Sequence, residues 1–181
     1  GYGDLPYAMS RRHDVYGVDP DPERAAFGAS EYAPLPITQC RRDGLDFPDG
    51  MFDIVTSVVV VHFVPDPDQY LREIRRVLRD DGHVVLAAGN RAYLRNFFRR
   101  LAGRGPAPVN QWDRSWEEAR AFLRGHGFDI VAENYFFDPP SDIPWSLPGV
   151  AVGTIEQAIS LVGPRELANY YAILARKRSE V

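Results

Sequence analysis

The sequence predicts an α/β fold, in which an open and mostly parallel sheet carries helices on both faces. Short runs of branched and aromatic residues alternate with amphipathic stretches along the chain, as strands alternate with helices in such folds. One run, residues 52–61, is almost entirely apolar, which is typical of a strand covered on both faces. The length of 181 residues and the apolar content of 45% suit one domain that spans residues 1–181.

The first half of the chain contains four predicted strands, at residues 13–19, 36–42, 52–61 and 83–89. A helix is expected directly after Gly3. A second helix is expected over residues 22–32, because Pro22 suits the first turn of a helix.

The stretch 67–82 is predicted to be a helix, because its apolar residues recur at helical spacing. These residues are Tyr70, Leu71, Ile74, Val77 and Leu78. Asp66 or Asp68 is expected to cap its start, and Gly82 is expected to end it.

The second half of the chain continues the alternation. Residues 91–104 and 154–162 are predicted helices. Ser115 and Glu118 form an S-x-x-E capping box, which predicts the start of a further helix. The last two strands are predicted at residues 128–137 and 166–178, and the closing strand is expected to be antiparallel.

Ligands of open α/β sheets bind beyond the carboxyl ends of the strands, so the residues that end strands are the first candidates. Asp19 ends a predicted strand, and Gly1 and Gly3 lie just ahead of the first helix. Glycines there let the backbone approach a ligand closely, and the helix behind them points its amide groups at that ligand. A carboxylate at position 19 can accept hydrogen bonds from both hydroxyls of a ribose. The alternative is a turn or capping role, because DPDPE is also a good turn sequence.

The end of the next predicted strand carries Asp43, Gly44 and Leu45. A carboxylate there can accept a hydrogen bond from an adenine amino group, while Leu45 lines the ring. Ordinary loop chemistry is the alternative explanation for the same three residues.

Several motifs together resemble the class I S-adenosylmethionine-dependent methyltransferases, in particular the group that acts on small molecules, lipids and glycans. The motifs are GYG before a helix, VYGVDPDPE, FPDGMFDIVTSVVVVHFVPDPDQYLREIRRVLRDDGHVVL and SWEEARAFLRGHGFDIV, in this order. The resemblance covers nearly the whole chain and implies a Rossmann-like sheet with an antiparallel C-terminal strand. It also implies S-adenosylmethionine as the cofactor, and methyl transfer by in-line displacement onto a small-molecule, lipid or glycan acceptor.

The resemblance assigns a set of cofactor-binding residues. They are Gly1, Gly3, Asp19, Pro20, Asp43, Gly44, Leu45, Ser57 and Val58. The two N-terminal glycines match the tail of the family's glycine-rich loop, and Asp19 matches its ribose-binding acid. Asp43 with Gly44 matches the turn that contacts adenine, and Ser57 with Val58 matches the strand end beside the methionine part.

Two features depart from the family pattern. The family's first strand, which is central in the sheet, and the earlier part of its glycine loop have no counterpart here. Because the neighbouring strands would lose their backbone partners, we expect the chain to be a fragment of a longer protein. In addition, the loop CRRDGLDFP is short, so that Arg41 or Arg42 could take the place expected for the adenine-binding acid.

Methyl transfer needs little catalytic machinery, because a methyl sulfonium is already activated and orientation can supply much of the rate. A base helps when the acceptor is a hydroxyl group. His62, at the exit of the strand 52–61, is predicted as that base because its charge changes near neutral pH. The alternative is that His62 packs in the core or caps the turn before Pro65.

The acceptor site is predicted to be covered by residues 90–112 and 138–165. The candidates for substrate binding are Asn90, Arg91 and Arg95. Arginines that recur every four residues share one helix face, which would suit an anionic or phosphate-bearing acceptor. A solvated helix face is the alternative.

Composition argues against several other classes of protein. The net charge of −4 gives no reason to expect nucleic-acid binding. Cys40 is the only cysteine, and the four histidines lack the spacing of metal ligands, so no metal site is expected. No apolar run is long enough to cross a membrane, and a cytoplasmic location without stable membrane insertion is expected. The oligomeric state stays open.

Two other functions remain compatible with a carboxylate at the end of the second strand. A NAD(P)-dependent oxidoreductase or epimerase would also hold a ribose there, but the chain has no Y-x-x-x-K pair, and its single lysine is Lys177. A non-catalytic relative would bind the cofactor, or only a partner protein, for regulation.

Overall fold

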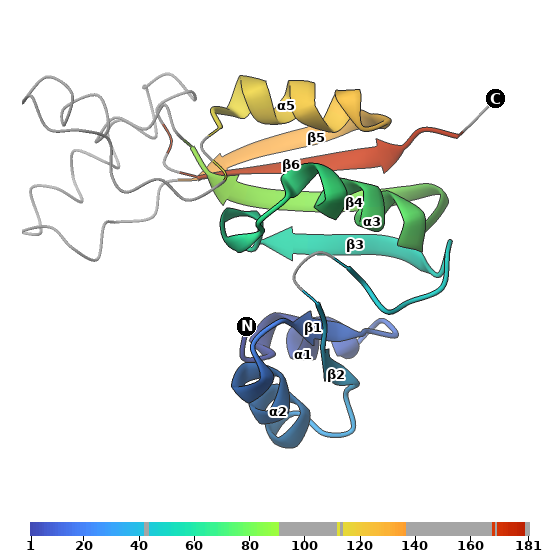
Figure 1. Cartoon of the computed structure of the whole chain (residues 1–181), viewed down its shortest axis with the longest axis vertical. Coiled ribbons are helices and arrows are strands. Elements are labelled where there is room, and N and C mark those ends of the chain that lie inside the picture. Colours follow the sequence, from blue (N-terminus) through green and yellow to red (C-terminus); the bar gives the residue numbers. More distant parts are fainter. Residues whose placement is uncertain (42–43, 91–111, 113, 137–167, 169, 180–181) are drawn as a thin grey trace, which may run out of the picture. The chain divides into compact units, whose positions relative to one another are not determined.

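The computed structural model describes residues 1–41, 44–90, 112, 114–136, 168 and 170–179 (Figure 1). These residues divide into two compact units, Gly1–Phe47 and Pro48–Val181. The predicted helices at 91–104 and 154–162 lie outside the described residues, and the single domain over 1–181 stays a prediction.

The first unit contains two helices and two short parallel strands. Its elements are α1 (Asp4–Ser10), β1 (Gly17–Asp19), α2 (Pro22–Glu31) and β2 (Ile37–Gln39). β1 pairs with β2 from Gly17 opposite Ile37 to Asp19 opposite Gln39. The predicted helix over 22–32 is confirmed, and Asp21 caps it by accepting hydrogen bonds from the amides of Glu23 and Arg24.

Ile37 is the centre of the small core of this unit. A methyl group added at Gly3 would lie 2.8 Å from Ile37, and one added at Gly17 or Gly28 would lie 3.0 Å from it. These close approaches explain why three glycines surround one branched side chain, which is itself buried.

The second unit is built on a four-stranded sheet with the order β3-β4-β6-β5. Its elements are β3 (Phe52–Val58), the short 3-10 helix η1 (Val61–Phe63), α3 (Pro67–Val77), β4 (Leu78–Gly89), α5 (Trp116–Gly125), β5 (Phe128–Phe136) and β6 (Tyr170–Lys177). β3 and β4 are parallel, whereas β6 runs antiparallel to both β4 and β5. The predicted antiparallel closing strand is therefore confirmed.

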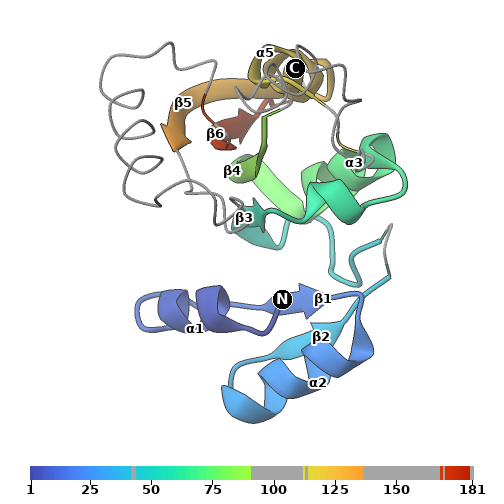
Figure 2. The same ribbon diagram turned by 90° about the vertical axis from the view of Figure 1, so that its left-hand side faces the viewer.

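Helices α3 and α5 lie on the same side of this sheet (Figure 2). His126, which follows α5, contacts Asp68 in the first turn of α3 with 3.1 Å between Nε2 and Oδ1. The capping box predicted at Ser115 and Glu118 is confirmed, because both of its hydrogen bonds are present. Among the described elements of the second unit, no helix lies on the other side of the sheet.

Several predicted boundaries are wrong. The strands predicted at 36–42, 52–61 and 83–89 are Ile37–Gln39, Phe52–Val58 and Leu78–Gly89. The strand predicted at 13–19 covers only Gly17–Asp19. The helix predicted over 67–82 ends at Val77, because Leu78 has an extended backbone and pairs with Phe52 at the start of β3. Gly82 lies inside β4 and does not end the helix. Of the two predicted caps, Asp66 is the one that accepts the amide hydrogen bond.

Strand β3 is less covered than its apolar sequence predicts. Ile54 is 53% exposed and Val58 is 44% exposed, whereas Ser57 is fully buried. Ile54 and Val58 lie on the face opposite Ser57, which contacts Tyr70 of α3, and no described helix of the second unit covers that face. β3 is also the edge strand of the described sheet and pairs there only with β4 (Figure 1). The expectation of cover on both faces is therefore wrong for the described residues.

Candidate functional site

Asp19 is a buried carboxylate at the carboxyl end of β1, with only 8% of the residue exposed. One oxygen, Oδ1, accepts a hydrogen bond from the amide of Asp21 at 2.9 Å. The other oxygen, Oδ2, accepts from the amino group of Gly1. Its backbone carbonyl accepts from the amide of Cys40 at 3.1 Å, just past β2. The side chain is thus held against the N-terminal glycine segment, as the sequence predicted.

The surroundings of Asp19 favour its charged form. Burial alone would raise the pKa of this carboxyl, but the hydrogen bonds that it accepts, among them that from the Asp21 amide, outweigh burial, so that the pKa lies below its ordinary value. The same carboxylate acts on Cys40, whose pKa is raised by burial and by the charge of Asp19. Residue 19 is therefore an ionised acceptor at neutral pH.

Gly3 is the turn that starts α1. Its φ angle is +105°, a conformation that L side chains rarely adopt, and its carbonyl accepts the amide of Tyr7 at 3.0 Å. An added methyl group would also meet Tyr32 at 2.8 Å. Both backbone geometry and packing therefore require glycine at this position.

The adenine part of the predicted site is only partly described. Asp43 lies outside the described residues. Gly44 is buried and forms an isolated antiparallel bridge with Arg41, whose guanidinium would lie 2.9 Å from a methyl group added at Gly44. Leu45 is half-buried, and the carbonyl of Pro20 accepts a hydrogen bond from Gln39 at 3.4 Å. The expectation that Arg41 or Arg42 takes the place of the adenine-binding acid stays a prediction.

In the second unit, the carboxyl end of β3 presents Ser57 and Val58. Ser57 is fully buried, and its Oγ accepts a hydrogen bond from the hydroxyl of Tyr70 on α3 at 3.0 Å. Val59 then takes a positive φ of 56° while its amide bonds to the carbonyl of Ala87 at 2.9 Å. The strand therefore ends sharply at Val58, and Tyr70 is a residue of this site that the sequence did not identify.

His62 lies in η1, directly after this strand end, and is 9% exposed. Its Nε2 accepts a hydrogen bond from the amide of Gly89 at 2.9 Å. This histidine therefore connects the carboxyl ends of β3 and β4. Burial lowers the pKa of His62, although the backbone of Trp112 partly opposes the shift. The imidazole is therefore neutral near pH 7, and its Nε2 is already engaged.

Two further hydrogen bonds lie at the same end of the sheet. The Asn90 side chain, which is 5% exposed, donates from Nδ2 to the carbonyl of Ala168 at 2.9 Å. The indole of Trp112, which is 3% exposed, donates to the hydroxyl of Tyr171 at 2.7 Å. Burial raises the pKa of Tyr171, so the phenol is neutral at ordinary pH.

These hydrogen bonds involve described residues that border the two predicted cover segments. Asn90 and Trp112 flank residues 91–111, and Ala168 follows residues 137–167. Substrate binding by Asn90 stays a prediction. In this structure its side-chain nitrogen donates a hydrogen bond to the carbonyl of Ala168. Arg91 and Arg95 lie outside the described residues. No sequence signal links Trp112 to a tyrosine 59 positions away, which is why the pair was missed.

Comparisons with known proteins decide the family. Residues 1–86 match the family described as methyltransferase domain. The chain is 36% identical over 145 residues to phosphatidylethanolamine N-methyltransferase of Cereibacter sphaeroides, which covers 77% of this chain and 65% of that protein. The chain belongs to the S-adenosylmethionine-dependent methyltransferase family. It spans just under two thirds of the length of this curated relative.

Two further methyltransferases are similar to this family member. One is a ubiquinone biosynthesis O-methyltransferase of Acinetobacter baumannii, 23% identical over 181 residues, with 84% of this chain and 75% of that protein covered. The other is a solved structure of a methyltransferase in complex with the Trm112 methyltransferase activator of Haloferax volcanii. It is 20% identical, has a TM-score of 0.72, and the match covers 100% of this chain and 80% of that chain. This structure supports the α/β methyltransferase fold with its mixed sheet.

The residues of the first unit fit the adenosyl cofactor that this methyltransferase family uses. A carboxylate oxygen offers more than one lone pair, so Asp19 can accept ribose hydroxyls in addition to its bonds from the Asp21 amide and from Gly1. Among the residues that the structure describes, no group of three or more His, Cys, Asp or Glu side chains is arranged to hold a metal ion. Likewise, no helix in the described ranges is long and apolar enough to cross a membrane.

Proposed function

We propose that this protein transfers a methyl group from S-adenosylmethionine to a small-molecule or lipid acceptor, with the primary amine of phosphatidylethanolamine as the first candidate. One observation carries the cofactor part, namely the buried, ionised carboxylate of Asp19 at the end of β1 beside Gly1. The acceptor part rests on the 36% identity to a protein named for methylating that lipid.

In this proposal the first unit holds the nucleoside. Asp19 accepts hydrogen bonds from the ribose hydroxyls, and Gly1 and Gly3 allow a close approach of the backbone. Asp43, Gly44 and Leu45 take the adenine. When bound, S-adenosylmethionine supplies a methyl group that is already activated on a sulfonium sulfur.

The second unit supplies the side that faces the acceptor. Ser57 and Val58 lie at the end of β3, where Tyr70 fixes the serine hydroxyl. The Nε2 lone pair of His62 accepts the Gly89 amide, so Nδ1 carries the proton of the neutral ring, and a base role would require the bond to Gly89 to open. An amine acceptor, which is an ammonium at neutral pH, has to lose a proton to solvent before its lone pair attacks the methyl group, but during the transfer itself it needs less help from a base than a hydroxyl does. This difference favours an amine as the acceptor to test first.

The proposed cover segments, residues 90–112 and 138–165, would exclude water from the acceptor. Their described borders support this role, because Asn90 bonds to Ala168 and Trp112 bonds to Tyr171. Both pairs lie at the end of β4 where Gly89 pairs with Tyr170. The described residues that border the two segments therefore lie at the same end of the sheet as Ser57 and His62.

The cofactor is tested by calorimetric titration of the protein with S-adenosylmethionine, S-adenosylhomocysteine and NAD. Both adenosyl ligands should bind, and Asp19→Asn should weaken them more than about tenfold, because it removes the charge that accepts the ribose hydroxyls. Asp14→Asn is the matched control, since Asp14 is an exposed acid outside the site. Binding of NAD alone would instead support the oxidoreductase alternative.

The acceptor is tested by transfer of a radioactive methyl group to lipid vesicles. Label should enter vesicles of phosphatidylethanolamine and should not enter vesicles of phosphatidylcholine, whose nitrogen has no lone pair left. Cofactor binding without transfer to phosphatidylethanolamine would reject this acceptor while leaving the enzyme class intact; ubiquinone precursors and glycans would be tested next. Cofactor binding without transfer to any acceptor in a cell extract would favour a non-catalytic role.

A further inference from the structure

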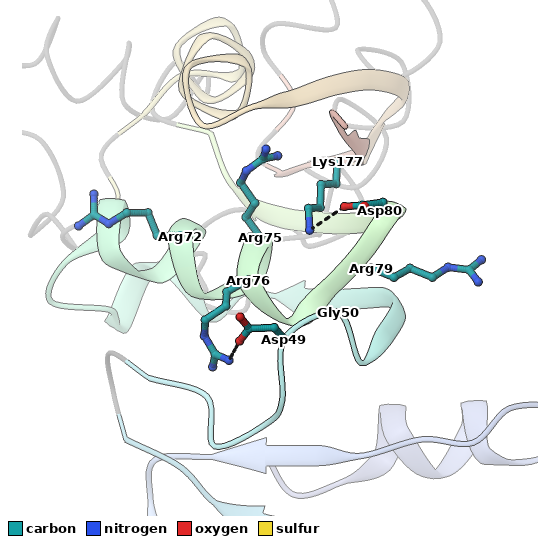
Figure 3. Close-up of a pocket in the computed structure, with 8 residues that line it drawn as sticks. All are labelled: Asp49, Gly50, Arg72, Arg75, Arg76, Arg79, Asp80 and Lys177. Atoms are coloured by element: carbon teal, nitrogen blue, oxygen red, sulfur yellow. Dashed lines mark hydrogen bonds and ion pairs between the residues drawn. The ribbon is translucent and has the colours of Figure 1, made fainter. Parts of the chain in front are cut away.

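A groove lined by cationic side chains lies at the end of the four-stranded sheet opposite the exits of β3 and β4. It encloses about 590 Å³, and its lining residues are Arg72, Arg75, Arg76, Arg79, Lys177, Asp49, Gly50 and Asp80 (Figure 3). They come from the turn before β3, from α3, from the start of β4 and from the end of β6. None of the candidate site residues lines this groove, so it is separate from the proposed methyl transfer.

Backbone carbonyl groups hold two of the cations in place. Arg75 donates from Nη1 to the carbonyls of Gly127 at 3.0 Å and Arg178 at 3.1 Å. Lys177 donates from Nζ to the carbonyl of Leu78 at 2.7 Å. These contacts fix where the two cationic groups lie, and Lys177 also contacts Asp80 with 3.4 Å between Nζ and Oδ1.

Arg76 is oriented within its own helix. Its Nε and Nη2 bond to the two carboxylate oxygens of Glu73, each at 2.9 Å, and this paired geometry fixes the plane of the guanidinium. Asp49 takes the remaining Nη1 at 2.7 Å. The guanidinium is therefore presented toward the groove in a defined orientation.

The carboxylates on the rim are much more exposed than the cations that they meet. Asp49 and Asp80 are each 81% exposed, whereas Lys177 is 15% exposed and Arg76 is 32% exposed. Ion pairs with such exposed partners contribute little to stability. An incoming anion with a higher charge can therefore replace these carboxylates while the cations stay where they are.

We propose that this groove binds a phosphate-bearing anion with at least two negative charges. Arg75, Arg76 and Lys177 form the centre. Figure 3 shows Arg72 and Arg79 extending away from this centre in opposite directions, and Arg79 pairs with Asp53 at 2.8 Å, so these two arginines add to the positive charge around the groove. Arg75 and Arg76 lie in the last turn of α3, where cations also stabilise a helix. Helix stabilisation alone does not explain why cations from β4 and β6 line the same groove.

The experiment uses the purified protein and two sets of probes. Calorimetry compares inorganic phosphate with pyrophosphate, and vesicle flotation compares anionic phosphatidylglycerol with phosphatidylcholine. Pyrophosphate should bind about tenfold more tightly than phosphate, and the affinity should fall steeply as salt is raised. The Arg72→Gln, Arg79→Gln double variant changes only exposed side chains and should lose about tenfold in affinity. The control is Arg124→Gln, on the exposed surface of α5 outside the groove.

The vesicle arm separates the two sources of phosphate. Binding of pyrophosphate without binding of phosphatidylglycerol identifies a soluble ligand. Binding of phosphatidylglycerol that the double variant loses identifies a lipid headgroup. The proposal is overturned if neither probe binds, if the double variant binds as tightly as the parent, or if Arg124→Gln causes the same loss. None of these results depends on S-adenosylmethionine binding.

Discussion

The two ends of the four-stranded sheet are held by different chemistry. At the exits of β3 and β4, buried and uncharged groups pair: Tyr70 with Ser57, Gly89 with His62, Asn90 with Ala168, and Trp112 with Tyr171. At the opposite end, charged groups pair near the surface: Arg76 with Asp49, Arg79 with Asp53, and Lys177 with Asp80.

This difference separates a rigid end from an adaptable one. A buried hydrogen bond is strong in its low-dielectric surroundings, and each unpaired partner is costly, so the pairs near His62 tolerate one geometry. Exposed ion pairs are screened by water and exchange partners at little cost. A fixed arrangement suits the orientation that methyl transfer needs, whereas exchangeable partners suit an anion that arrives and leaves.

The largest expected effect is that of Trp112→Ala at the rigid end. The indole is 3% exposed, packs edge-on against Phe122 with 5.3 Å between ring centroids, and carries the hydrogen bond to Tyr171. Its removal leaves a cavity and an unpaired phenol, which should lower the free energy of unfolding by about 3–5 kcal/mol. Urea denaturation followed by circular dichroism measures this loss. A loss below about 1 kcal/mol, as expected for an exposed ion pair, would show that the buried pairs contribute no more to stability than the charged pairs at the opposite end.

Tyr171→Phe tests the hydrogen bond apart from the packing. The ring stays in place, but the Trp112 indole loses its partner in a fully buried position, which should cost about 1–3 kcal/mol of unfolding free energy. Tyr170→Phe is the matched control on the same strand, because Tyr170 is only half-buried. Equal stability of the two variants would show that the buried pair contributes nothing.

The features that the sequence predicts correctly are those decided by residues close together in the chain. The cap at Asp66, the capping box at Ser115 and the helix at Pro22 are confirmed, because residues within one turn decide them. The end of the α3 helix at Val77 is mispredicted. There, pairing of Leu78 with Phe52 on another strand overrides the helical spacing of the apolar residues.

The candidate site shows the same limit. Asp19 could be predicted, because a strand that ends in an acid beside a glycine turn is a local pattern. The Ser57–Tyr70 and Trp112–Tyr171 pairs could not, because they join residues from different elements, 13 and 59 positions apart. The resemblance to methyltransferases supplied strand-end positions such as Ser57, but not the partners that fix them.

A smaller effect is expected from the titration of His62. Because its pKa lies below the ordinary value when folded, the unfolded state binds more protons in the window between the folded pKa and about 6.5. Stability should therefore be fully present above about pH 6.5 and should decrease as pH falls through that window. His62→Gln keeps an acceptor for the Gly89 amide but cannot titrate. Unfolding curves across this pH range should be flatter for the variant, and parallel curves would contradict the assignment.

The smallest effect belongs to Arg79→Ala at the adaptable end. Arg79 is 63% exposed and its partner Asp53 is 70% exposed, so losing their contact should change the unfolding free energy by less than about 1 kcal/mol. Added salt should shrink even this difference, because it screens the pair in the parent protein. The same change removes one cation from the groove and should weaken pyrophosphate binding. Weaker binding with nearly unchanged stability is the combination that an adaptable end requires, and a large, salt-independent loss of stability would show that this end is as rigid as the other.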